Sequence, residues 1–256
     1  MEKTTTTPRG EWFHDWFDEN YELVYENRTD AEAEDFVSHW PVDWKELAGR
    51  RALDIGCGRG RFCRALASRG VKTVGIDLSR EQLKLAGMKS AHDNPIRLIR
   101  ADMRRLPLKN EFGLITSLFT SFGYFETDGE HKRVLLDFVC LLSRSGIIVI
   151  DLPNPEFVIR EVKTTPVTVK QVNGVRIVES RKLTAENSRV EKEIVLTAKD
   201  QKSYYHESVR LFSAAELQMM TAAAGLAQTA PYWGDYSGNE MSPTSPRMVF
   251  FGKRNG

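Results

Sequence analysis

Short apolar runs alternate with amphipathic stretches between residues 51 and 152. The apolar runs predict strands, and the stretches with apolar residues at helical spacing predict helices. Ser79 with Gln82, and Thr127 with Glu130, form residue pairs that start a helix with a capping box. Strands are predicted over 52–55, 73–76, 96–99, 114–117 and 147–152, and helices over 61–68, after Ser79 and after Thr127. This alternation predicts a parallel sheet that helices cover on both faces.

Helices are also predicted before the first of these strands. Residues 11–25 carry a stripe of aromatic and apolar side chains at helical spacing, so they predict one amphipathic helix. A further helix is predicted from Thr29 to His39, ended by Pro41. Residues 1–10 are polar and lack the apolar segment of a secretory signal, so we expect a frayed tail there.

The pattern changes after Pro153. From residue 166 to residue 212, polar and apolar residues alternate, which predicts successive strands, and Asn173-Gly174 predicts a two-residue hairpin turn. We expect an antiparallel meander that is inserted into the larger domain. Ser213 with Glu216 predicts a further helix that ends near Gly225, and two strands near 228–233 and 248–252 complete the sheet.

The chain has 256 residues, of which 41% are hydrophobic, and its net charge is +1. A near-neutral charge disfavours nucleic acid as a partner, because phosphate binding needs a basic excess. No apolar stretch approaches the length of a membrane span. Cys57, Cys63 and Cys140 lack metal-like or disulfide-like spacing, so we expect no metal site and reduced thiols in the cytoplasm.

A glycine-rich turn follows the first of the strands between residues 51 and 152. Gly56, Gly58 and Gly60 come directly after it, and Asp77 ends the second strand. This layout presents a nucleoside to backbone amides and places a carboxylate near ribose hydroxyls. Dinucleotide folds carry G-x-G-x-x-G because a pyrophosphate sits on the helix N-terminus. The spacing here is instead G-x-G-x-G, after Asp54.

The segment from Asp54 to Gly60 resembles motif I of class I S-adenosylmethionine-dependent methyltransferases. The acid Asp77, the sequence Ala101-Asp102-Met103 and the strand end at Ser117 also match that family, over about residues 51 to 152. Arg144-Ser-Gly146 departs from the family's usual Pro-Gly-Gly. The resemblance implies S-adenosylmethionine as cofactor, bound by Tyr21, Arg28, Asp54, Gly56, Cys57, Gly58, Gly60, Asp77, Leu78, Asp102, Met103, Ser117 and Leu118. Alternatively, the glycines form only a tight turn, Asp77 caps a helix and Asp102 is a solvated acid.

Pattern and resemblance together imply an α/β fold, a Rossmann-like doubly wound and mostly parallel seven-stranded sheet with an inserted antiparallel β meander. We expect an N-terminal helical cap over 1–45, a cofactor-binding core over 46–152, an inserted β lid over 153–212, and a C-terminal helix and β hairpin over 213–256. The meander suits a lid because methyl transfer benefits from a dry site. It could alternatively form the interface of a homodimer.

The segment from Leu118 to Phe125 resembles the corresponding stretch of small-molecule methyltransferases, including sugar N,N-dimethyltransferases. By that resemblance Tyr124 faces the acceptor, beside Phe119, and is a candidate catalytic residue, although it could equally be a packed aromatic residue. The segment lacks the Asn/Asp-Pro-Pro-Tyr motif of nucleobase amino-methyltransferases. The aromatic helix resembles the opening helix of the same enzymes, so Tyr21 or Tyr25 would reach the methionine end of the cofactor and Arg28 would pair with its carboxylate.

Three further residues are candidates for the acceptor site. His206 is a candidate general base, because a neutral imidazole accepts protons near pH 7, although a strand histidine is more often structural. Asp235 and Arg247 lie in a polar, aromatic and turn-rich stretch and are candidates to bind polar groups of the acceptor.

The sequence thus predicts a methyltransferase that acts on nitrogen or oxygen of a small-molecule acceptor. A methyltransferase for protein or RNA, a nicotinamide-dependent oxidoreductase and a cofactor-binding scaffold without activity are the alternatives.

Overall fold

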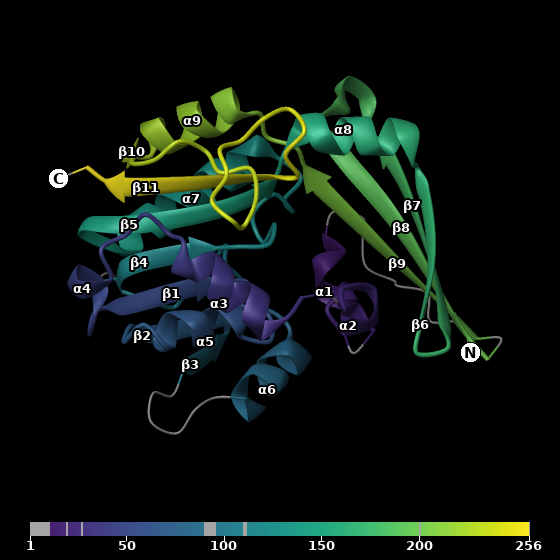
Figure 1. The fold of residues 1–256 in the computed structure, drawn as a ribbon, viewed down its shortest axis with the longest axis horizontal. Helices are drawn as coiled ribbons and strands as arrows, with labels where there is room; N and C mark the ends of the chain where they lie inside the picture. Colours follow the sequence, from purple (N-terminus) through teal and green to yellow (C-terminus); the bar gives the residue numbers. More distant parts are fainter. Residues whose placement is uncertain are drawn as a thin grey trace.

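The computed structural model describes residues 11–18, 20–26, 28–89, 96–109, 112–199 and 201–255. The tail predicted over 1–10 lies outside the described residues. Figure 1 shows two sheets, a larger one near the C-terminus and a smaller one made of long strands, with short helices between them.

The larger sheet has seven strands in the order β10-β11-β5-β4-β1-β2-β3. Its members are β1 (Arg51–Ile55), β2 (Lys72–Asp77), β3 (Arg97–Arg100), β4 (Phe112–Ser117), β5 (Leu142–Pro153), β10 (Leu226–Gln228) and β11 (Arg247–Arg254). The pairs among β1 to β5 are parallel, and β11 lies antiparallel to both β5 and β10. The predicted seven-stranded, mostly parallel sheet is therefore confirmed.

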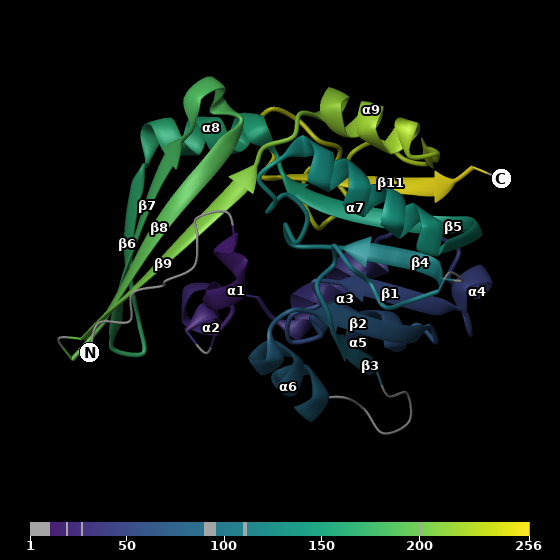
Figure 2. The same ribbon diagram turned by 180° about the vertical axis from the view of Figure 1, so that it is seen from behind.

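Helices cover both faces of this sheet (Figures 1 and 2). The buried side chains of α3 (Asp30–Ser38) and α5 (Arg61–Ala67) pack with one face, and those of α7 (Asp128–Leu141) and α9 (Ala214–Ala223) pack with the other. The remaining helices around the sheet are α4 (Trp44–Leu47) and α6 (Arg80–Met88). The capping boxes predicted for α7 and α9 are present, and the side chain of Ser79 caps α6.

The smaller sheet is an antiparallel meander in the order β6-β7-β8-β9. Its strands are β6 (Val167–Val172), β7 (Val175–Leu183), β8 (Arg189–Ala198) and β9 (Gln201–Arg210), with a 3-10 turn, η2 (Ala185–Asn187), before β8. Asn173 and Gly174 both have positive φ angles, as the predicted hairpin turn requires. The meander predicted after residue 166 is confirmed.

The predicted aromatic helix over 11–25 is wrong in its length. The chain instead forms two short helices, α1 (Phe13–Trp16) and α2 (Tyr21–Val24). The Asp18 carboxylate accepts the backbone N–H of Asn20 at 2.8 Å. This local hydrogen bond takes the place of a helical backbone hydrogen bond between α1 and α2. Both helices lie between the two sheets (Figures 1 and 2).

Two further predictions need correction. A helix that the alternation did not reveal, α8 (Pro155–Thr164), connects β5 to the meander. Asn154 caps it and a proline occupies its first turn, which are ordinary signals of a helix start. The strand expected near 228–233 is β10, at Leu226–Gln228. Farther along, Trp233 makes only isolated bridges, to Val249 and Glu240.

Within the described ranges, no helix combines the length and the apolarity that crossing a membrane would require.

Candidate active site

Two adjoining cavities lie at the carboxyl ends of the parallel strands, where β1 and β4 are neighbours. Strand order reverses at this point of the sheet, and such switch points are the usual ligand sites of open α/β sheets. With the open space at their mouths included, the first cavity has a volume of about 1090 Å³ and the second about 620 Å³. Both are lined by Phe17, Tyr21, Tyr25, Arg28, Phe119 and Tyr124, which therefore form the boundary between them.

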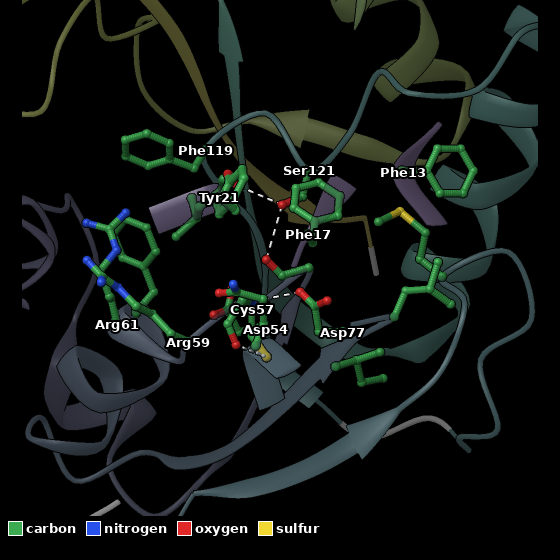
Figure 3. Close-up of a pocket in the computed structure, with 18 of the residues that line it drawn as sticks. Phe13, Phe17, Tyr21, Asp54, Cys57, Arg59, Arg61, Asp77, Phe119 and Ser121 are labelled. Atoms are coloured by element: carbon green, nitrogen blue, oxygen red, sulfur yellow. Dashed lines mark hydrogen bonds between the residues drawn. The ribbon is translucent and has the colours of Figure 1, made fainter. Parts of the chain in front are cut away.

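The glycine turn and Asp77 form one side of the first cavity (Figure 3). The Gly58 N–H donates to Asp77 Oδ2 at 2.7 Å, and the Ser79 N–H donates to Asp77 Oδ1 at 2.8 Å. A Cβ at Gly56 would lie 2.4 Å from Ser121 Oγ, so only glycine lets the turn approach the β4 loop this closely. Burial raises the pKa of Asp77. Its oxygens retain lone pairs for ribose hydroxyls.

Asp54 lies behind the same turn and is almost fully buried. It accepts hydrogen bonds from Thr116 Oγ1 at 2.8 Å and from Cys63 Sγ at 3.4 Å. Burial raises its pKa to about 6, against the effect of those bonds. A buried carboxylate with this pKa gains from a cationic ligand, because a nearby positive charge favours the ionised form.

Asp102 and Met103 line the far end of the first cavity. Arg104 donates to Asp102 through its guanidinium, with Nη2 at 2.6 Å, and through its backbone N–H. Burial alone would raise the pKa of Asp102, but the Arg104 bonds hold it below the usual value. An ionised acceptor at this position suits an adenine amine.

Three arginines line a third side of the first cavity. Arg59 pairs with Glu22 at 3.2 Å and Arg61 pairs with Glu32 at 2.8 Å. Arg28 donates to the Tyr21 hydroxyl, and its guanidinium lies 3.8 Å from the Tyr25 ring centroid and 3.9 Å from that of Phe119. No carboxylate among the described residues forms an ion pair with it.

Among the described residues that line the cavity, Arg28 is therefore a positive charge without an anionic partner. An anionic ligand group could therefore bind at Arg28, where it would meet a guanidinium that is already held in place by aromatic rings.

Tyr124 lies at the boundary of both cavities, and aromatic rings surround it. Its ring lies 4.7 Å from Trp12 and 6.2 Å from both Phe13 and Phe17, measured between centroids. Burial raises its pKa well above that of a free phenol. Tyr124 therefore stays protonated at neutral pH and offers a hydrogen bond, not a base.

The meander forms a wall of the second cavity through Val190, Glu207 and Val209. Glu207 accepts hydrogen bonds from Trp16 Nε1 and Tyr25, and it pairs with Lys192 at 2.8 Å. These contacts tie the meander to the two short helices. Sequence analysis missed Glu207, since no motif marks an acid within a strand.

The structure brings most of the expected cofactor residues to the first cavity. Those that line it are Tyr21, Arg28, Asp54, Gly56, Cys57, Gly58, Asp77, Leu78, Asp102, Met103 and Leu118. Gly60 and Ser117 are not among its lining residues. Gly60 caps α5 in a left-handed conformation, and a Cβ there would lie 3.1 Å from that of Ala86. Ser117 is buried at the end of β4.

Some of the residues predicted to bind the acceptor line the second cavity, and others line neither cavity. Phe119 and Arg247 line the second cavity together with Tyr124. His206 is not among the lining residues of either cavity, because neighbours in a strand face opposite sides of the sheet and Glu207 faces inward. Asp235 organises its own turn, where it accepts the backbone N–H groups of Ser237 and Asn239.

Gln82 is a lining residue that sequence analysis assigned only to a helix start. It is buried, and its side-chain Nε2 has no hydrogen-bond partner among the described residues. Leaving a buried amide without an acceptor is costly, so this atom favours a polar ligand at the adjoining turn. With Asp77, Asp102 and Arg28, it makes a donor and acceptor set that fits a nucleoside bearing an amino-acid end.

Comparisons with known proteins agree with this geometry. Residues 52–146 match a family described as methyltransferase domain. A cypemycin N-terminal methyltransferase from Streptomyces is 25% identical over 82% of this chain and 85% of its own length. Other curated relatives match less fully: a putative methyltransferase and several ubiquinone biosynthesis O-methyltransferases match over 22% to 56% of their length.

Solved structures share the fold over nearly the whole chain. A methyltransferase from Clostridium acetobutylicum that depends on S-adenosylmethionine has a TM-score of 0.78 and 18% identity, over 93% of this chain and 96% of that one. An amino pentose methyltransferase from Micromonospora echinaspora, CalS10, has a TM-score of 0.62 and 19% identity, over 93% of this chain and 98% of that one.

Proposed function

We propose that this chain, a class I S-adenosylmethionine-dependent methyltransferase, transfers a methyl group to a nitrogen or oxygen atom of a small-molecule acceptor. The observation that carries the proposal is the pair of adjoining cavities. The first has donors and acceptors that suit S-adenosylmethionine, and the second shares with it a boundary of Arg28 and aromatic side chains.

We assign the chain's residues to the cofactor as follows. Asp77 would accept the ribose hydroxyls and Asp102 the adenine amine. Asp54 would stabilise the cofactor's α-ammonium group by its negative charge, and Arg28 would pair with the cofactor's carboxylate. When bound, the cofactor supplies a methyl carbon on a positively charged sulfur. The protein's part is to align the acceptor with that carbon, which can contribute about 7–11 kcal/mol through positioning.

The second cavity has the properties of an acceptor site. Aromatic side chains make up much of its lining, and a site that a lid keeps dry suits a reaction in which positive charge is dispersed. Tyr124 would donate a hydrogen bond to the acceptor, and Arg247 would contact its polar groups. We propose that the meander acts as a lid, because β8 and β9 supply Val190, Glu207 and Val209.

A nitrogen acceptor is the better candidate of the two. No histidine is among the residues described as lining either cavity, and Tyr124 is protonated at neutral pH. The one carboxylate described in the second cavity, Glu207, is already bound by Trp16, Tyr25 and Lys192. A neutral amine needs no base before its lone pair attacks, whereas a hydroxyl does. CalS10, whose solved structure shares this fold, is an amino pentose methyltransferase.

A peptide amino terminus is the second candidate acceptor. The relative that aligns with 82% of this chain is a cypemycin N-terminal methyltransferase. Both candidates place an amine at Tyr124, but a peptide would extend past the mouth of the second cavity.

The experiment that tests the proposal is an acceptor screen. Purified protein is incubated with S-adenosylmethionine and with amino sugars, other small amines, alcohols or short peptides, and S-adenosylhomocysteine is measured. We expect turnover with at least one class of amine. Turnover with alcohols alone would contradict the preference for nitrogen, and turnover with folded protein or RNA alone would contradict the small-molecule acceptor.

A further inference from the structure

Two consecutive residues after β4 have left-handed backbones. The φ angles of Phe119 and Thr120 are 58° and 68°. Such angles are uncommon for residues other than glycine, and they are costly for a β-branched residue such as Thr120. Strained backbone of this kind persists only where the surroundings fix it, and it is frequent at functional sites.

The carboxylate of Asp151 fixes this turn. Asp151 lies near the end of β5 and is fully buried. Its Oδ2 accepts the backbone N–H of Phe119 at 2.8 Å, and its backbone oxygen accepts the N–H of Thr120 at 3.1 Å. One residue therefore holds both strained positions.

Two other side chains hold Asp151 in turn. Arg247 donates to Asp151 Oδ1 through Nε at 2.8 Å, and its Nη2 also donates to Thr120 Oγ1 at 3.1 Å. The Tyr236 hydroxyl donates to Asp151 Oδ2 at 2.7 Å. The carboxylate thus has several partners, which is what a buried charge requires.

The turn determines where the Phe119 ring stands. The ring lies on the side of the first cavity opposite Asp54 and Asp77 (Figure 3), and it lines both cavities. The Arg28 guanidinium stacks on it, 3.9 Å from its centroid. Because stacking fixes the plane of a guanidinium, the orientation of Arg28 depends on the Phe119 ring.

We propose that Asp151 is a positioning residue, which, through Phe119, aims Arg28 at the amino-acid end of the cofactor. The inference rests on the proposed function, because it assumes that Arg28 binds the cofactor's carboxylate. Asp151 lines neither cavity, and it would act on Arg28 through the turn. Its bond with Arg247 concerns the second cavity instead. The adenosine side of the site, at Asp77 and Asp102, does not depend on it.

The test compares two ligands that share adenosine and differ at the amino-acid end. S-adenosylhomocysteine has that end, and 5′-methylthioadenosine lacks it. Calorimetry should show that Asp151→Asn binds S-adenosylhomocysteine about tenfold more weakly than the parent, while its affinity for 5′-methylthioadenosine stays within about twofold. A merely structural role would lower both affinities together.

Matched tyrosine variants extend the test if Asp151→Asn folds poorly. Tyr236→Phe removes one hydrogen bond to Asp151. It should lower the affinity for S-adenosylhomocysteine about threefold and leave the affinity for 5′-methylthioadenosine unchanged. Tyr232→Phe is its control, because the Tyr232 hydroxyl donates to the backbone oxygen of Ala214 and, within the described part of the chain, has no contact with Asp151. In the Asp151→Asn background, Thr120→Asn should recover part of the loss, since asparagine tolerates positive φ angles.

Equal losses for both ligands, or no loss for either in Asp151→Asn and Tyr236→Phe, would overturn the positioning role. These outcomes differ from failure of the proposed function, in which the parent protein would bind neither ligand.

Discussion

At the scale of single residues, Asp77 both stabilises the glycine turn and is placed to bind the ligand. Its two oxygens accept the N–H groups of Gly58 and Ser79, so the carboxylate holds the glycine turn and the start of α6 in place. Its exposure to the first cavity leaves lone pairs for a bound nucleoside. Removing it should therefore affect binding more than any neutral lining residue would.

Replacing Asp77 with alanine should weaken cofactor binding by about 1–3 kcal/mol, the scale of losing a charged hydrogen-bond partner. Titration calorimetry with S-adenosylhomocysteine measures the effect. Asp137→Ala is the control, because Asp137 pairs with Arg133 on the exposed side of α7. Unchanged affinity in Asp77→Ala would mean that Asp77 is not the ribose ligand.

Asp54 should make cofactor affinity depend on pH. Its pKa is raised to about 6, so the free protein holds a proton there at pH 5 and has released it by pH 7. If the cofactor's ammonium group requires the ionised form, affinity should rise about tenfold from pH 5 to pH 7.

Calorimetry of Asp54→Asn across the same range should give a nearly flat profile. Asp77→Asn is measured in parallel, because burial raises the pKa of Asp77 as well. A slope that persists in Asp54→Asn and disappears in Asp77→Asn would assign the proton to the other carboxylate.

Among single residues, those in the glycine motif could be predicted and those that depend on distant contacts could not. Gly56, Gly58 and Asp77 are close in sequence to the strands that position them, so spacing alone placed them in the first cavity. Glu207 and Asp151 lie within strands, and only tertiary packing brings them to the site. His206 lines neither cavity, because its neighbour Glu207 faces the second one, and its role as a base stays a prediction.

At the scale of elements, the meander should determine which acceptors bind. Val190 lines the second cavity from β8, whereas Val195 on the same strand faces the opposite side of the sheet. Val190→Phe should fill part of the cavity and raise the KM for the acceptor severalfold, with unchanged affinity for S-adenosylhomocysteine.

Val195→Phe provides the matched control, and steady-state kinetics with the acceptor found by the screen is the measurement. Equal kinetics for the two variants would argue that the meander has no part in acceptor binding and would favour the alternative of a dimer interface.

Element types were predictable wherever the pattern was strong and local. Thr127 and Glu130, and Ser213 and Glu216, form capping boxes in the structure because a cap needs only neighbouring residues. The break between α1 and α2 was missed because aromatic periodicity continues across it, while Asp18 turns the backbone. The helix α8 was missed because its capping residue, Asn154, directly follows a strand.

At the scale of the whole molecule, two sheets and the short helices between them enclose the second cavity. Contacts such as Trp16 with Glu207 join residues that are 191 positions apart. No periodicity or motif encodes such a contact, so the sequence predicted a lid over the carboxyl end of the fifth strand without predicting its contacts with the N-terminal helices. Much of the parallel core was predictable because β1 with β2, β2 with β3, and β4 with β5 pair through local strand-helix-strand units. The pairing of β1 with β4 has no such unit.

The central claim is that the first cavity binds a sulfonium nucleoside without phosphate. Titration calorimetry of the purified chain with S-adenosylmethionine, S-adenosylhomocysteine and NAD⁺ tests it most directly. The account predicts that the first two bind, that Asp77→Ala weakens both, and that NAD⁺ does not bind. Binding of the dinucleotide, with no heat from either sulfur nucleoside, would contradict it.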